Sequence, residues 1–185
     1  NRQLDRGKVV ASINFAKPDS YYDSRLDEIY GGRVLSIDKR NEATIDWSTY
    51  DIIFIPGGNQ RWLKETLIES NFSVDKLKKS VVVISDSAGA YLMSAYFVRY
   101  DVELDDIDDL DLKELVDTGF YTSSHVITLA HVNNKRYVSD KVLEVTKSIA
   151  DKLGARFVAL EENEEKTLDE NLNIVNVDVD ELFSD

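Results

Sequence analysis

The stretch that decides the fold is Val81–Ala90, which reads VVVISDSAGA. Its first part, Val81–Ile84, is the most hydrophobic run of the chain and predicts a buried strand of a parallel sheet. Small residues follow from Ser87 onward, and a helix is expected to begin there at once. Such a tight strand-to-helix turn lifts the Ser87 hydroxyl above the carboxyl edge of the sheet. It also places the backbone N–H of Ala88 at a helix N-terminus, where it would stabilise an oxyanion.

The motif around Ser87 departs from the G-x-S-x-G pattern of activated serines, because Ser85 stands where the first glycine would be. A serine at the start of a helix also serves often as an N-cap, whose hydroxyl accepts a backbone hydrogen bond. Short motifs of this kind carry a real false-positive risk. The motif alone therefore leaves two interpretations open, an activated nucleophile and a helix cap.

Outward from this stretch, apolar runs alternate with helical patterns. The predicted strands are Lys8–Phe15, Arg33–Ile37, Tyr50–Ile55, Val81–Ile84, Val126–Leu129, Phe157–Leu160 and Asn173–Val177, with a further β-prone segment at Phe120–Thr122. The predicted helices are Tyr22–Tyr30, Arg61–Ser70, Val74–Lys79, Ala88–Val98 and Asp140–Leu153. Strands that alternate with helices indicate a parallel sheet joined by right-handed crossovers. We therefore expect an α/β fold, a three-layer α/β/α sandwich with a mostly parallel central sheet, formed as one domain over residues 1–185.

Composition excludes several classes of function. The chain has no cysteine, which excludes disulfides, a thiolate nucleophile and cysteine metal sites. Its two histidines are too few for a histidine-rich metal site. A formal net charge of −13 lacks the basic footprint that nucleic acids and anionic membranes need. We expect a cytoplasmic protein without metal or cofactor and without a nucleic-acid or membrane partner; a homodimer is one open assembly state.

A second feature is the loop Ile55–Asn59, IPGGN, at the end of the strand that precedes the serine strand. Loops at the carboxyl ends of adjacent parallel strands converge on one crevice. Consecutive glycines expose backbone N–H groups there, which would supply the second half of an oxyanion hole. The same glycines also suit a tight turn with a positive φ, and the two interpretations are compatible.

An activated serine needs a general base with a pKa near neutrality, and histidine is the usual one. The candidates are His125 and His131. His125 follows Gly119–Ser124 and is expected at the end of a strand, whereas His131 follows the apolar run Val126–Ala130. Chain order differs among known triads, so the residues alone leave both histidines open.

Composition cannot select the acid of a triad, because the chain has 35 aspartates and glutamates. The candidates are Asp101, Glu103 and Asp105 after the nucleophile helix, and Glu161 and Glu162 after a late strand. Most of these side chains are expected to be solvated surface groups. The acidic run Asp101–Asp117 lacks the glycine and terminal glutamate spacing of a calcium loop, so we predict no metal site there.

The loop IPGGN, the turn SAGA and a histidine beyond them together resemble the dipeptidase E and cyanophycinase family of serine peptidases. The stretch Ser87–Met93 is particularly similar to dipeptidase E. This family resembles a branch of the class I glutamine amidotransferase superfamily in which serine replaces the usual cysteine, and the missing cysteine fits that branch. The similarity runs from Lys8 to Val177 and implies a flavodoxin-like, glutamine amidotransferase-like fold.

The resemblance implies roles around the nucleophile. Ser87 matches the family nucleophile, and the N–H groups of Gly58 and Ala88 match its oxyanion hole. Asn59 lies beside them as a substrate-binding residue. This sequence departs from the family in having Ser85 before the nucleophile turn where the family prefers glycine.

The resemblance also implies the remaining triad members. Tyr121–His125 resembles the strand-end position of the family histidine, so His125 is favoured as the base, with His131 as the alternative. The family's usual Pro-His pair is absent here. Cyanophycinase-like members use a glutamate at a late strand end, which favours Glu162 as the acid, and dipeptidase E-like members point to Asp101. The family's first strand is expected to be missing from this sequence.

The implied activity is hydrolysis of small peptides, with an acidic first residue such as that of an aspartyl dipeptide. A carboxylate side chain is best held by an arginine, and Arg136 or Arg61 could serve. The alternatives are another hydrolase on the same site, such as an esterase or β-aspartyl peptidase, and a catalytically degenerate binding or sensing relative.

Overall fold

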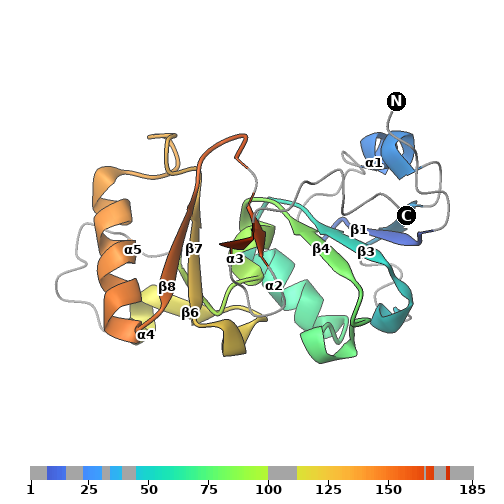
Figure 1. Cartoon of the computed structure of the whole chain (residues 1–185), viewed down its shortest axis with the longest axis horizontal. Helices are drawn as coiled ribbons and strands as arrows, with labels where there is room; N and C mark the ends of the chain where they lie inside the picture. Colours follow the sequence, from blue (N-terminus) through green and yellow to red (C-terminus); the bar gives the residue numbers. More distant parts are fainter. Residues whose placement is uncertain are drawn as a thin grey trace. The chain divides into compact units, whose positions relative to one another are not determined.

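The structure, a computed structural model, describes residues 8–15, 23–30, 34–38, 45–99, 112–164, 166–168 and 174–175 (Figure 1). The described residues up to Gly89 form one compact unit, and those from Ala90 onward form a second. Each unit contains a four-stranded sheet with parallel strands, accompanied by helices. The predicted α/β class with mostly parallel strands is therefore confirmed.

The sheet of the first unit is parallel throughout, in the order β2-β1-β3-β4. Its strands are β1 (Val10–Ile13), β2 (Val34–Ile37), β3 (Ile52–Ile55) and β4 (Val82–Ser85). Its helices are α1 (Asp23–Tyr30) and α2 (Gln60–Glu69), with 3-10 turns η2 (Trp47–Thr49) and η3 (Val74–Lys76). Val10, Leu26 and Ile52 form a buried cluster that packs α1 onto the sheet. The strands predicted for this part of the sequence are confirmed as strands, but β4, which was expected to be buried, is half-buried at the edge of this sheet.

Helix α2 follows the glycine loop because its local sequence specifies both its start and its buried face. Asn59 is the N-cap, and its side-chain Oδ1 accepts a 3.0 Å hydrogen bond from the backbone N–H of Trp62. Leu63, Thr66 and Leu67 are buried at the i, i+3, i+4 spacing of one helix face. The second predicted helix, Val74–Lys79, was wrong in length, since only the 3-10 turn η3 forms there.

Asp51 binds groups at the amino ends of the strands of this sheet, whereas Ser87 follows the carboxyl end of β4. Its Oδ2 accepts a 2.8 Å hydrogen bond from the Val9 N–H, and its Oδ1 lies 2.8 Å from Lys78 Nζ. The hydrogen bond from Lys78, together with that from Val9, lowers the pKa of the Asp51 carboxyl.

The sheet of the second unit has the order β6-β5-β7-β8, parallel except for the β5–β6 pair. Its strands are β5 (Tyr96–Val98), β6 (Val116–Thr118), β7 (Val126–Ala130) and β8 (Arg156–Leu160), and β9 (Thr167–Leu168) pairs separately with β10 (Ile174–Val175). The helices are α3 (Ala88–Leu92), which begins at the end of the first unit, α4 (Leu112–Leu115) and α5 (Asp140–Leu153), with a 3-10 turn η5 (Thr122–Ser124). Every residue of β7 is buried, as expected of a central parallel strand.

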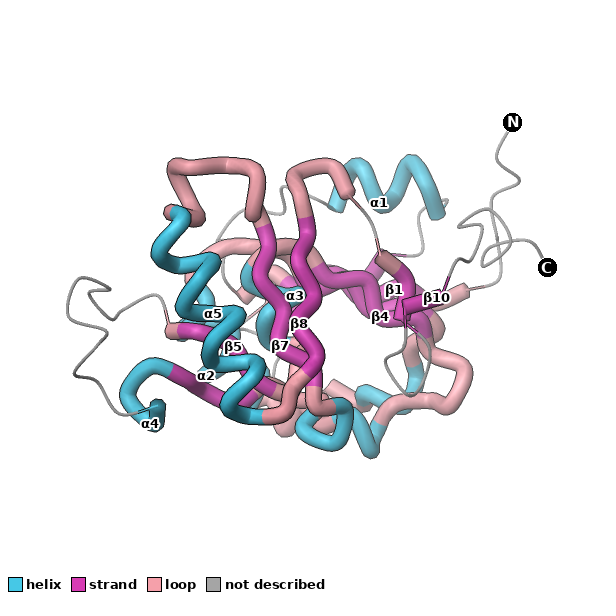
Figure 2. Tube along the Cα trace, turned by 60° about the vertical axis from the view of Figure 1, so that its left-hand side comes forward, coloured by secondary structure: helices cyan, strands magenta, loops and turns pink. Residues whose placement is uncertain are grey.

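Helix α5 has the bounds that the sequence predicts. Ser139 caps its start by accepting a 3.2 Å hydrogen bond from the Val142 N–H, and Gly154 ends it in the left-handed conformation. Ile149 and Ala150 join the buried core of this unit, where α5 packs against β7 and β8 (Figures 1 and 2). No helix in the described part of the chain is long and apolar enough to cross a membrane.

The predicted helix Ala88–Val98 was wrong in its second half. The helix ends at Leu92, and Tyr96–Val98 form β5 between β6 and β7. Aromatic and β-branched side chains favour a strand once neighbouring strands are available to pair with them. The expected β-prone segment Phe120–Thr122 was also misplaced, because the strand of this region is β6, which overlaps the end of the acidic run.

Candidate active site

Ser87 lies two residues after the end of β4 and has an unusual backbone conformation. Its φ is +48°, in the left-handed region that residues other than glycine rarely adopt. An N-cap residue has an extended backbone instead, so the helix-cap interpretation does not describe this serine. A left-handed backbone costs a residue with a Cβ roughly 1–2 kcal/mol. Strain of this kind is found at active sites, where the surrounding structure holds a residue in a fixed position.

Two glycines make this serine turn sterically feasible. A Cβ on Gly89 would lie 2.1 Å from the carbonyl oxygen of Ile55, so α3 meets the end of β3 at backbone contact. A Cβ on Gly57 would lie 2.8 Å from the Cβ of Ser87. The turn is completed by a 3.0 Å hydrogen bond from the Asp86 N–H to the Ile55 carbonyl. The glycines of both motifs are therefore required where the two loops touch.

The remaining residues of the glycine loop have partly structural roles. Gly58 is exposed and has a φ of +141°, which confirms the expected turn with positive φ. Asn59 uses its side-chain oxygen to cap α2, as described above. Ala88 is buried, with 3% exposure, at the start of α3. That Gly58 and Ala88 supply an oxyanion hole, and that Asn59 binds substrate, stay predictions.

The strain at Ser87 gives a stability prediction. The free energy of unfolding of Ser87→Gly should exceed that of Ser87→Ala by about 1 kcal/mol, because glycine adopts the left-handed conformation without a Cβ clash. In an ordinary conformation the order would reverse, since glycine gains more entropy on unfolding. Urea titrations of both variants, followed by circular dichroism, measure the difference. The reverse order would contradict a strained Ser87.

In the second unit, the structure brings His131 and Glu162 together. Strands β7 and β8 lie side by side (Figure 2). They pair in parallel with Ala130 opposite Leu160, and His131 follows β7 while Glu162 lies in the turn after β8. His131 Nδ1 lies 3.4 Å from Glu162 Oε1, and the two side chains are 23% and 39% exposed. The carboxyl ends of neighbouring parallel strands thus present an imidazole beside a carboxylate, the pairing that a general base needs.

Three residues that sequence reasoning missed hold this pair in place. Asn134 Nδ2 donates a 2.7 Å hydrogen bond to Glu162 Oε1, and the Glu162 N–H donates one of 2.8 Å to Asn133 Oδ1. The ring of Tyr137 lies against the imidazole of His131, with 4.9 Å between the ring centroids. The pair of asparagines after the histidine signals a turn, but no spacing rule connects it to a glutamate almost thirty positions later.

The position expected for His125 was wrong. The segment before it is the 3-10 turn η5, and His125 precedes β7 with a φ of +50°, so it does not follow a strand. Its carbonyl accepts a 2.7 Å hydrogen bond from the Arg156 N–H at the start of β8. His125 and His131 flank opposite ends of β7, which at about 3.3 Å rise per residue separates them by roughly 20 Å. His125 therefore lies at the amino edge of its sheet, away from Glu162.

The other predicted site residues have less definite positions. Asp101 lies outside the described residues. Arg136 is exposed, and its backbone N–H donates to Asn134 Oδ1 at 3.0 Å. Arg61 pairs with Glu65 at 2.8 Å and its side chain is 77% exposed. A substrate-binding role for either arginine stays a prediction. Within the described ranges, no cluster of histidine and acidic side chains could hold a metal ion.

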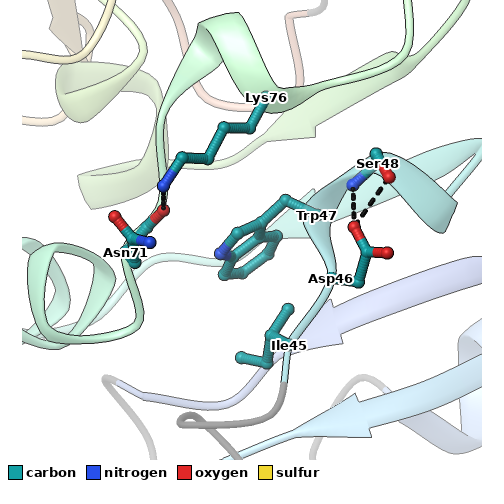
Figure 3. A pocket seen from close by; sticks show the side chains of 6 residues that line it. All are labelled: Ile45, Asp46, Trp47, Ser48, Asn71 and Lys76. Atoms are coloured by element: carbon teal, nitrogen blue, oxygen red, sulfur yellow. Dashed lines mark hydrogen bonds between the residues drawn. The ribbon is translucent and has the colours of Figure 1, made fainter.

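The first unit has a pocket that none of the predicted site residues lines. It is open, with a volume of about 480 Å³, and its lining comprises Ile45, Asp46, Trp47, Ser48, Asn71 and Lys76 (Figure 3). Its polar groups bind one another: Asp46 accepts hydrogen bonds from Ser48, and Lys76 donates to the Asn71 carbonyl. The indole of Trp47 donates to the Ser70 carbonyl and is buried, so it offers no exposed ring to a ligand. The pocket lacks the chemistry of a catalytic site.

Comparison with known proteins supports the fold. No protein-family model and no curated protein sequence matches this chain. A solved structure of a candidate peptidase E protein from Listeria monocytogenes EGD-e is similar, with a TM-score of 0.50 and 20% sequence identity. The similarity covers 86% of this chain and 80% of that chain. At this level of identity the likeness establishes a shared fold, and function has to be argued from the residues of the site.

Proposed function

We propose that this chain is a serine-type peptidase that hydrolyses small peptides by acyl transfer. Ser87 is the nucleophile, His131 the general base, and Glu162 the acid that orients the imidazole. The observation that carries the proposal is the left-handed φ of +48° at Ser87, immediately after a parallel strand. An ordinary helix start would not need this conformation, whereas an exposed nucleophile on a sharp turn does.

In the proposed reaction, Ser87 Oγ attacks the substrate carbonyl carbon while Nε2 of His131 takes the hydroxyl proton. The N–H groups of Gly58 and Ala88 stabilise the oxyanion that forms. His131 then gives its proton to the leaving amine, and a water molecule hydrolyses the acyl-enzyme by the same steps in reverse. The carboxylate of Glu162 lies 3.4 Å from Nδ1 of the imidazole. In the proposed mechanism the proton of the imidazole is on Nδ1, facing this carboxylate, and Nε2 is the proton acceptor.

The mechanism requires Ser87 Oγ and His131 Nε2 to come within hydrogen-bond reach. Within the second unit, one contact connects α3 to the strand that precedes the base. Tyr91, on α3, uses its hydroxyl to accept a hydrogen bond from the Ala130 N–H at 3.1 Å and to donate to the Ala130 carbonyl at 3.2 Å. The helix that follows the nucleophile is thereby bonded to the residue that precedes the base.

The substrate class is a finer part of the proposal and rests on the resemblance to dipeptidase E. A peptide with an acidic first residue needs a cation at its side chain. Arg136 is the better of the two candidates, because it belongs to the same loop as the base, whereas Arg61 is already paired with Glu65. Equal turnover of Asp-Leu and Ala-Leu would argue against acidic specificity.

A second candidate function is a binding or sensing module without catalysis. It is favoured by the residues before the nucleophile, where Ser85 replaces glycine and Asp86 is an exposed acid. A carboxylate next to Ser87 would repel an anionic substrate if it faced the site.

A fluorophosphonate probe decides between the two functions. We expect the probe to label the folded protein at a single residue, identified as Ser87 by peptide mass spectrometry, and to leave Ser87→Ala unlabelled. Ser85→Ala is the matched control and should be labelled like the wild type. A folded protein that the probe does not label would overturn the peptidase proposal and favour the binding module.

A further inference from the structure

Tyr137 occupies an unusual position beside the proposed base. Its ring centroid lies 4.9 Å from that of His131, with the two planes inclined by 37°. The residue is nevertheless 58% exposed, as one of the few large hydrophobic or aromatic side chains of the described chain that are open to solvent. One face of the phenol ring therefore contacts the imidazole while much of the side chain remains open to solvent.

The loop after β7 holds the Tyr137 backbone in place. The N–H groups of Tyr137 and Val138 both donate to the Asn134 carbonyl at 3.0 Å. Val138 is fully buried and anchors the loop in the core of this unit. The Asn134 N–H in turn donates to the His131 carbonyl at 2.9 Å. The exposure of Tyr137 is thus a feature of an ordered loop and not of a loose end.

The side chain of Asn134 connects this loop to the proposed acid. Its Oδ1 accepts the Arg136 N–H at 3.0 Å, which orients its Nδ2 toward Glu162 Oε1 at 2.7 Å. The imidazole of His131 is thereby bounded by Glu162 on its Nδ1 side and by Tyr137 on one face.

We infer that Tyr137 forms the wall of a subsite for the residue on the leaving-group side of the scissile bond, and that this subsite prefers an apolar or aromatic side chain. The inference rests on the proposed function. In acyl transfer, the imidazole that takes the serine proton also gives it to the leaving amine. The leaving residue therefore sits beside His131, and its side chain is within reach of the ring that packs on the imidazole. An exposed aromatic face binds apolar and aromatic groups.

The test compares two dipeptide series, Asp-Gly, Asp-Leu and Asp-Phe, and Ala-Gly, Ala-Leu and Ala-Phe. For whichever series is hydrolysed, we expect the full-length protein to show kcat/KM about tenfold higher for leucine or phenylalanine than for glycine as leaving residue. Tyr137→Phe keeps the ring and should keep this ratio. Tyr137→Ala should bring the ratio close to one. Ile68→Ala, which alters an equally exposed apolar side chain on α2, should leave the ratio at the wild-type value.

The outcomes separate the subsite from the reaction. A wild type without preference for the apolar leaving residues would overturn the subsite. An equal loss for all substrates in Tyr137→Ala, with the ratio kept, would also overturn it and leave Tyr137 as a positioning residue for His131. No hydrolysis of either series would overturn the proposed function, and the subsite with it.

Discussion

Replacing His131 by alanine is expected to lower kcat for peptide hydrolysis by on the order of 10⁴-fold. Without the imidazole, the Ser87 hydroxyl has no proton acceptor and the leaving amine has no proton donor. His125→Ala should leave kcat near the wild-type value, because His125 lies at the opposite end of β7 from Glu162. Steady-state kinetics on one dipeptide, together with the rate of fluorophosphonate labelling, measure both effects.

The control for this prediction is His131→Gln, which keeps a polar side chain of similar size but has no basic group. It should lose activity like His131→Ala while its unfolding transition stays close to that of the wild type. If His125→Ala were the inactive variant and His131→Ala the active one, the base would have to be His125, and the pairing of His131 with Glu162 would be structural.

The sequence did not predict which of the two histidines lies at the carboxyl end of a strand. The apolar run before His131 predicts β7 correctly, and the run before His125 was expected to be another strand. Instead, Thr122–Ser124 forms a 3-10 turn, in which the Ser124 hydroxyl donates to the Tyr121 carbonyl at 2.7 Å. Serine and threonine often bond to nearby backbone groups in this way, which competes with strand pairing. Local patterns indicate which residues are β-prone, but not which edge of the sheet a residue reaches.

Long-range pairing explains the remaining difference in the fold. The helical pattern after Ser87 continues in the sequence beyond Leu92, yet Gly119 makes close backbone contact at that point. Its N–H donates to the Ala95 carbonyl, and a Cβ on it would lie 2.1 Å from the Ser94 carbonyl oxygen. The contact joins positions more than twenty residues apart and brings β6 to β5, so no window of local sequence contains it. Strands β1, β3, β4 and β7 were predictable because their apolar runs carry the signal locally, although β4 is only half-buried.

The candidate site likewise has one part that a local motif predicts and one part that depends on long-range pairing. Ser87 and its glycines were found from a contiguous motif, because their chemistry and their geometry are both local. The set of Asn134, Tyr137 and Glu162 around His131 depends on the register between β7 and β8. The resemblance to a peptidase family selected Glu162 by its place after a strand, but its partners became visible only in the structure.

Gly89→Ala is expected to be the most destabilising single substitution in the nucleophile turn. The added Cβ would stand 2.1 Å from the Ile55 carbonyl oxygen and 2.9 Å from its carbonyl carbon, which are backbone atoms of β3 that cannot rotate away. Relief requires α3 to move off the strand end, which would also strain the 3.0 Å hydrogen bond from the Asp86 N–H to the same carbonyl. We expect a loss of about 3 kcal/mol in the free energy of unfolding, measured by urea titration.

Gly154→Ala is the matched control, because this glycine is required for a different reason. It has a φ of +61° at the end of α5, and a Cβ added to it would meet no atom within 4 Å. Gly154→Ala should therefore lower the free energy of unfolding by about 1 kcal/mol, the strain of placing alanine in the left-handed conformation. The two variants thus separate steric contact from conformational strain. Equal destabilisation by both would mean that α3 does not press on β3, and Ser87 would then lack the rigid support that the proposed mechanism needs. A larger loss in Gly89→Ala, accompanied by loss of phosphonate labelling in the protein that remains folded, would tie the backbone contact directly to the activation of Ser87.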